Sequence, residues 1–343
     1  MTKEEYKELN DYLNDLFIYL DKHYKFILDE MIRIFIINDK YLNHMKQYDL
    51  SYKFEENTLT YKDVYDCARK IIESINKEYL PLYDNLIETG QLDFSYNHEY
   101  FDSHFYHNRG LNIININRDF NYNDVVTLIH EFFHYLNGRN GRSFTNEILT
   151  EFISIYFETY AIKYLLDDGV TKEEIGYLDR LGSAYRRSYE LYYIETPLLA
   201  YNEFGNLSDD SIDLLNQFFT SSLTKEQFYN ECKYLLEYFR KIKNKYTNEK
   251  FTNERDSFEL QKKYAEDIIY HFKYFFGTMW AFYAINNCDI HDVIYINDHI
   301  NDDNMTFEIC MKKMKIEYDN QDIYEEILEY INKYFETLNI KRK

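Results

Sequence analysis

The sequence predicts a mainly α-helical fold with a small antiparallel β-sheet beside one helix. Residues that break regular structure are rare, because the 343 residues include only two prolines and nine glycines. Apolar residues recur at steps of three and four, as at Leu13, Phe17 and Leu20, and this spacing marks one face of a helix. Only the region from about 92 to 117 departs from the helical pattern.

Residues 1 to about 90 are expected to form several long helices. Thr60 followed by Asp63 is typical of a helix start, and Gly90 is typical of a helix stop. After this point the residue pattern changes from helical spacing to short segments rich in aromatic and β-branched residues. The change divides the chain into an N-terminal helical region, 1–90, and a second region, 91–343. We expect the two regions to form one continuous unit, since no low-complexity linker separates them.

Three short segments rich in aromatic and β-branched residues interrupt the helical pattern: LDFSY, FDSHFYH and LNIININ. They predict two or three strands of a small antiparallel sheet. The last strand has an edge with which an extended peptide could pair through its main chain. Helices are expected to resume at Asn123 or Asp124 and to continue almost to the end of the chain.

Charge and composition exclude several classes of partner. Hydrophobic residues make up 45% of the chain, which excludes a disordered protein. The 60 acidic and 39 basic residues give a formal charge of −21, and such a surface repels nucleic acid and anionic membranes. Four scattered cysteines, none in a C-x-x-C pair, indicate free thiols in a reducing compartment. Because no apolar segment is long enough to span a bilayer, the protein is expected in the cytoplasm.

The segment NDVVTLIHEFFHYLNG contains the H-E-x-x-H pattern. Asp124 is a suitable N-cap and Gly138 a suitable C-cap, so the two histidines are expected in the middle of one helix. At positions i and i+4, the Cβ atoms of His130 and His134 lie about 5–6 Å apart, and both imidazoles can then bind one zinc ion. Glu131 lies beside that ion, where it can take a proton from bound water and pass it to a leaving amine.

A second helix, beginning near Thr145, carries candidate ligands for the same ion. Glu147, Glu151 and Glu158 fall on one stripe of this helix, whose other residues are largely apolar. A carboxylate in such surroundings needs a partner. A zinc ion bound by two histidines and one glutamate supplies that partner and leaves a fourth position for water. The alternative is a helix with two ordinary surface histidines.

The segment DVVTLIHEFFH resembles the thimet oligopeptidase and oligopeptidase F family of zinc peptidases, of the gluzincin type. In that family, D-V-x-T-L-x-H-E-x-G-H precedes a helix carrying E-x-x-S-x-x-x-E, which is matched here by Glu151, Ser154 and Glu158. The resemblance implies one zinc ion per chain, with Glu151 as the third ligand and Glu158 as a carboxylate that orients a ligand histidine. Thermolysin-like families place this ligand in an Asn-Glu pair, which Asn146 and Glu147 match. Glu151 is preferred because the serine and the second glutamate accompany it.

The sequence also departs from the family pattern. Phe133 stands where the family has a glycine, and its ring is expected to narrow the space near the metal. The interval between His130 and Glu151 is shorter than is usual in the family. The chain is also shorter than full-length members, so the resemblance covers at best residues 92–290.

A further resemblance lies in the segment YHFKYFFGTMWAFYAI, where the family carries a histidine followed by several tyrosines. Those side chains donate hydrogen bonds to the developing oxyanion, and the matching residues here are His271, Tyr274 and Tyr283. Phe276 and Trp280 stand where some members have tyrosine, so fewer hydroxyl groups are available. The alternative is an aromatic helix buried in a core.

The predicted function is that of a zinc metalloendopeptidase that cleaves short peptides, with residues 91–343 as the catalytic region. One alternative is a non-catalytic descendant that binds peptides or protein partners in the same cleft. Another is a toxin-like zinc protease that acts on one folded target, which the lack of an obvious delivery domain disfavours. His104 and His107 could flank the cleft, but no role is assigned to them.

Overall fold

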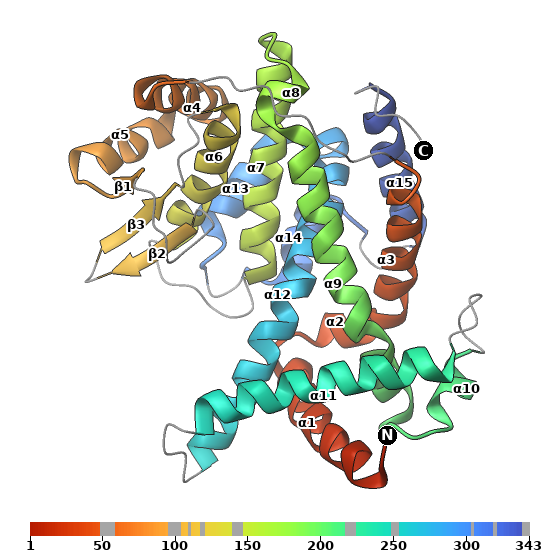
Figure 1. Cartoon of the computed structure of the whole chain (residues 1–343). Helices are drawn as coiled ribbons and strands as arrows, with labels where there is room; N and C mark the ends of the chain where they lie inside the picture. The colour runs from red at the N-terminus through yellow and green to blue at the C-terminus, as the bar shows by residue number, and fades with distance from the viewer. Residues whose placement is uncertain are drawn as a thin grey trace. The chain divides into compact units, whose positions relative to one another are not determined.

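The computed structural model of the chain is mainly helical, as predicted (Figure 1). It describes residues 1–48, 59–94, 104–108, 111–116, 121–138, 147–216, 224–247, 254–302, 305–317 and 321–337. This part of the chain forms two compact units, each built from two stretches of sequence. Because α9 (Tyr177–Phe204) and α12 (Glu254–Asn287) are continuous helices, each belongs partly to both units.

The first unit comprises Met1–Lys46 and Tyr185–Phe272. Besides parts of α9 and α12, it contains α1 (Lys3–His23), α2 (Lys25–Asp29), α3 (Met31–Met45), α10 (Ser211–Leu215) and α11 (Lys225–Thr247). Leu13 and Leu20 of α1 are fully buried in its core, in agreement with the helical spacing of apolar residues. Arg240 of α11 forms an ion pair with Glu8 of α1, with 2.7 Å between Nη2 and Oε2.

The second unit comprises Gln47–Ala184 and Lys273–Lys343. Its remaining elements are α4 (Tyr61–Ile75), η1 (Lys77–Tyr79), α5 (Leu80–Glu88), β1 (Leu92–Asp93), β2 (His104–Asn108), β3 (Leu111–Asn115), α6 (Tyr122–Gly138), α7 (Glu147–Asp167), α8 (Lys172–Ile175), α13 (Ile290–His299), α14 (Phe307–Lys313) and α15 (Gln321–Thr337). The boundary between the units falls inside the stretch 1–90, and the predicted division of the chain by function stays a prediction.

The helix signals at Thr60 and Gly90 are confirmed. The Thr60 side chain accepts a hydrogen bond from the Asp63 backbone, and the Asp63 carboxylate accepts one from the Thr60 backbone, which makes a capping box at the start of α4. Gly90 adopts a left-handed φ of 69°. In that conformation the Gln91 N–H reaches the Leu86 carbonyl and closes the end of α5.

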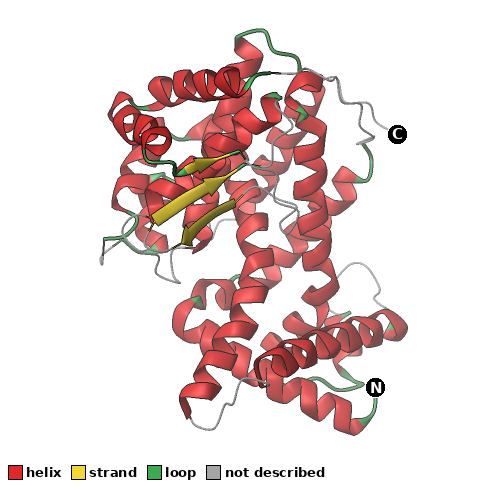
Figure 2. Cartoon of the chain, turned by 60° about the vertical axis from the view of Figure 1, so that its left-hand side comes forward, coloured by secondary structure: helices red, strands yellow, loops and turns green. Residues whose placement is uncertain are grey.

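The small sheet beside α6 is mixed, so the prediction of an antiparallel sheet is wrong in part (Figure 2). β2 pairs with β3 antiparallel, as expected, but β1 pairs with β3 parallel. The strand order β1-β3-β2 explains the difference, because β3 inserts between two strands that run in opposite directions. Ile114 and Asn115 have strand partners on both sides. The expectation of a free edge for a peptide is therefore wrong at these two residues.

Helix α6 begins earlier than the sequence suggested. Its first residue is Tyr122, and the side chain of Asn121 accepts a hydrogen bond from the Asp124 N–H at 3.2 Å. Asn121 therefore serves the capping role that the sequence analysis gave to Asp124. Gly138 ends α6 as predicted. The expected start of the next helix at Thr145 lies outside the described residues.

Helices α6 and α7 lie side by side and form the centre of the second unit (Figure 1). The rings of Phe133 and Phe157 stack across this contact with centroids 3.7 Å apart. Phe132, on the same helix, meets Tyr83 of α5 edge to face. Because close aromatic packing leaves little freedom to slide, the first contact holds α6 against α7 and the second holds α6 against α5. Within the described residues, no helix is both long and apolar enough to cross a membrane.

The second half of α12 approaches α7 through a glycine. A Cβ atom added to Gly277 would lie 2.7 Å from Ile155 Cδ1, 3.4 Å from the Phe152 backbone nitrogen and 3.5 Å from the Glu151 carbonyl carbon. A methyl group at this position would displace the end of the Ile155 side chain and touch the backbone of α7, so a larger side chain has no room without moving α12. The close approach brings the preceding turn of α12 to the side chain of Glu151.

We predict that Gly277→Val destabilises the protein by about 1–3 kcal/mol, because a branched side chain overpacks the contact with α7. Gly277→Ala is the matched control. Its helix propensity gain of about 1 kcal/mol offsets much of the displacement of the flexible Ile155 side chain. Urea unfolding of the three proteins measures both effects. A valine variant as stable as the wild type would contradict the close approach.

Candidate metal centre

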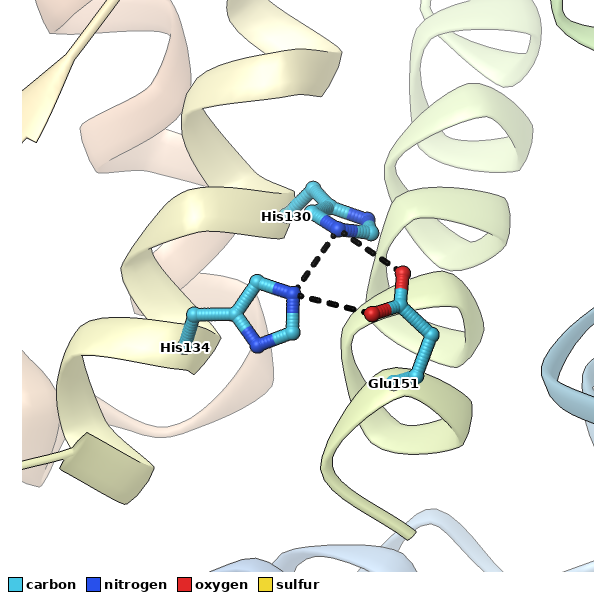
Figure 3. A group of neighbouring side chains, drawn as sticks. All are labelled: His130, His134 and Glu151. Carbon is cyan, nitrogen blue, oxygen red and sulfur yellow. Dashed lines mark hydrogen bonds and ion pairs between the residues drawn. The ribbon is translucent and has the colours of Figure 1, made fainter. Parts of the chain in front are cut away.

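The two histidines of the H-E-x-x-H motif point toward a common position from one face of α6 (Figure 3). His130 and His134 lie one helical turn apart, and their Nε2 atoms are 3.0 Å from each other. The rings are nearly perpendicular, with centroids 4.7 Å apart. Both Nε2 atoms can therefore approach one small ion from different directions.

Glu151 of α7 completes the cluster from the opposite side (Figure 3). Its Oε1 lies 3.4 Å from Nε2 of His130, and its Oε2 lies 3.5 Å from Nε2 of His134. The Glu151 side chain is 1% exposed, and its two oxygens face the ring nitrogens of the two histidines. Three donor atoms within 4.8 Å of one another form a set that suits zinc in type and number. A buried carboxylate also needs positive charge beside it.

The other ring nitrogen of His130, Nδ1, contacts a second carboxylate. Nδ1 of His130 lies 2.9 Å from Oε2 of Glu158, two turns along α7 from Glu151. An Nδ1–H that donates to this carboxylate fixes the tautomer and leaves the lone pair of Nε2 for a metal. Glu158 thus lies in contact with His130, and its role of orienting a ligand histidine stays a prediction.

The protonation of His130 depends on the two carboxylates beside it. Burial disfavours the imidazolium of His130, but the carboxylates of Glu151 and Glu158 outweigh burial and raise its pKa to about 10. Since this lies above the unfolded value of about 6.5, the stabilisation is complete below about pH 6.5 and is lost as the pH rises toward 10. A metal ion must displace this proton, so metal binding weakens as the pH falls.

Lys273 of α12 belongs to the same cluster, and the sequence analysis missed it. Its Nζ lies 3.2 Å from Oε2 of Glu151, and the lysine side chain is 17% exposed. Burial opposes the charge of Glu151, but Lys273 and the two histidines hold the pKa of this carboxyl well below its ordinary value. The signal in the sequence was a lysine inside the aromatic run YHFKYFFG, where a charged group needs a partner.

The remaining predicted acidic residues lie near the centre in sequence. Glu131 follows the first histidine on α6 and is 7% exposed. Its role as a base stays a prediction. Glu147 opens α7 one turn before Glu151. Among the described residues, the group that could hold a metal consists of His130, His134 and Glu151, without Glu147.

The predicted oxyanion donors lie along α12. Tyr274 is half-buried, and its ring centroid lies 5.1 Å from Nζ of Lys273. Tyr283 packs near Tyr330 of α15, with ring centroids 6.3 Å apart. His271 precedes the boundary between the two units. The roles of His271, Tyr274 and Tyr283 stay predictions.

Phe133, which stands where the family that the sequence resembles has a glycine, contributes to the hydrophobic core of the second unit. Its ring is fully buried, stacks on Phe157, and meets Tyr79 edge to face at 5.9 Å. The Phe133 side chain thus helps to hold α6 against α7. The side chains of His104 and His107, like the residue Asn146, lie outside the described part of the chain.

We predict that Glu151→Ala weakens zinc binding at least tenfold more than Glu147→Ala does. Glu151 offers a buried oxygen to the cluster, whereas Glu147 lies one turn away. A competition titration against a chromophoric chelator measures both affinities, with circular dichroism to check that each variant folds. The reverse order would assign the third ligand to Glu147.

Comparison with known proteins adds a likeness of fold. No model of a known protein family matches the chain, and no curated protein matches it either. The crystal structure of a "putative peptidase from Chlamydophila abortus" matches over 98% of this chain, with a TM-score of 0.50 and 15% sequence identity. The match covers 55% of that chain, so the present chain spans about half the length of its structural neighbour.

Proposed function

We propose that the protein is a zinc metallopeptidase of the thimet oligopeptidase and oligopeptidase F type, acting on short peptides. The observation that carries this proposal is the convergence of His130, His134 and Glu151 on one position, with Glu158 behind the first histidine. Two imidazoles and one carboxylate leave the fourth position of a tetrahedral zinc ion open, which is the arrangement of catalytic rather than structural sites.

Zinc bound at this centre would polarise a peptide carbonyl and make a water molecule more acidic. The chain itself must then move a proton from that water to the amine that leaves. Glu131 suits this task because it follows a proposed ligand histidine on α6 and is buried, with 7% of its surface exposed.

Hydrogen-bond donors on α12 would stabilise the negative charge that develops on the carbonyl oxygen. Tyr274 is the best candidate in the second unit, because it neighbours Lys273, whose ammonium contacts the ligand Glu151. His271 and Tyr283 are proposed for the same task by the resemblance in sequence. Each of these side chains would donate a hydrogen bond to that carbonyl oxygen.

Two further observations support a peptidase. The motif DVVTLIHEFFH resembles the family pattern except at Phe133, and the spacing of Glu151, Ser154 and Glu158 matches it. The fold is similar to that of a protein described as a "putative peptidase", although the chain is only about half as long. Peptide is therefore the proposed substrate, and zinc the proposed cofactor at one ion per chain.

We predict that Glu131→Gln retains zinc but lowers peptide cleavage by about 10²–10⁴-fold, because the amide cannot accept the proton of the attacking water. Zinc content and cleavage of a peptide library, followed by mass spectrometry, measure the two properties on one preparation. Glu88→Gln, which changes an exposed carboxylate of the same unit, is the matched control. Cleavage by Glu131→Gln at the wild-type rate would exclude this residue as the base.

A further inference from the structure

The two oxygens of Glu151 have different surroundings. Oε2 lies 3.2 Å from Nζ of Lys273, within the range of a direct ion pair. Oε1 faces Nε2 of His130 at 3.4 Å, and Oε2 also faces Nε2 of His134 at 3.5 Å. The Lys273 ammonium therefore lies against one oxygen, whereas the other oxygen faces the imidazole of a candidate metal ligand.

The backbone of α12 determines that Lys273 reaches this carboxylate. Gly277 lies one turn after Lys273 and allows α12 to approach the α7 backbone at Glu151 and Phe152. Residues four apart share one face of a helix, so the lysine projects from the face that meets α7. The Lys273 ammonium also lies 5.1 Å from the centroid of the Tyr274 ring, a contact that attracts a cation.

We propose that Lys273 is a positioning residue of the metal centre. Its ammonium holds Oε2 of Glu151, so that the carboxylate offers the metal only Oε1 and the fourth position stays open for water. In the metal-free protein the same ammonium compensates the buried negative charge of Glu151. This inference rests on the proposed metal centre, and it adds a residue that the H-E-x-x-H pattern does not contain.

Removing the lysine has two opposite consequences. The buried carboxylate loses a partner, which destabilises the metal-free protein. The metal site loses a positive charge that repels a dication, and both oxygens of Glu151 become available. Without the lysine, we therefore expect a less stable metal-free protein that binds a metal ion more tightly and with a higher coordination number.

The test uses cobalt, whose visible absorption falls in intensity as a tetrahedral site gains a ligand. Wild type, Lys273→Met and the control Lys313→Met are loaded with Co²⁺. Lys313 also pairs with a carboxylate of the second unit, that of Asp292 at 3.4 Å. For Lys273→Met we expect weaker visible absorption, roughly tenfold tighter cobalt binding and a lower Tm without metal. Lys313→Met is expected to keep the wild-type spectrum and affinity.

An unchanged spectrum or an unchanged or weaker cobalt affinity in Lys273→Met would overturn the proposal. If the methionine variant does not fold, Lys273→Gln replaces it, and tighter cobalt binding is again the expected result. A wild-type protein that binds no cobalt overturns the metal centre itself. If wild type binds cobalt but the spectrum does not change in Lys273→Met, the metal centre stands and only the role of Lys273 is overturned.

Discussion

A buried carboxylate, that of Glu151, imposes the main physical requirement on the centre of this protein. Removing an ionised carboxylate from water costs several kcal/mol unless cations or hydrogen-bond donors surround it. Glu151 is 1% exposed, and its oxygens lie within 3.5 Å of two imidazole nitrogens and one ammonium group. These groups come from α6 and α12, so the charge of one side chain requires three helices to meet.

The packing of the second unit brings the three helices together at Glu151. Stacked aromatic rings fix α6 against α7, and Gly277 lets α12 approach the backbone of α7. Each nitrogen of His130 has a carboxylate partner, since Nδ1 faces Glu158 and Nε2 faces Glu151. If these side chains bind a cation, as proposed, support of this kind leaves little rearrangement to make.

Local sequence patterns predicted the helices and the clustering of His130, His134 and Glu151, because both depend on short-range spacing. Two histidines four residues apart face one way on any helix, and glutamates spaced along a helical stripe face the same neighbour. The contribution of Lys273 could not be predicted by spacing, because it lies more than 120 residues after Glu151 in the sequence. The parallel pairing of β1 with β3 was missed for a related reason: strand order depends on tertiary contacts. The start of α6 differed because Asn121, and not Asp124, is the capping side chain.

The central claim is that His130, His134 and Glu151 hold a metal ion. Plasma emission analysis of the purified protein, after extensive dialysis against metal-free buffer, tests it most directly. Wild type is expected to retain one zinc ion per chain. His134→Ala is expected to retain none, while its circular dichroism spectrum stays that of a folded helical protein. A wild type without stoichiometric metal, or a folded His134→Ala protein that keeps its zinc, would contradict the account.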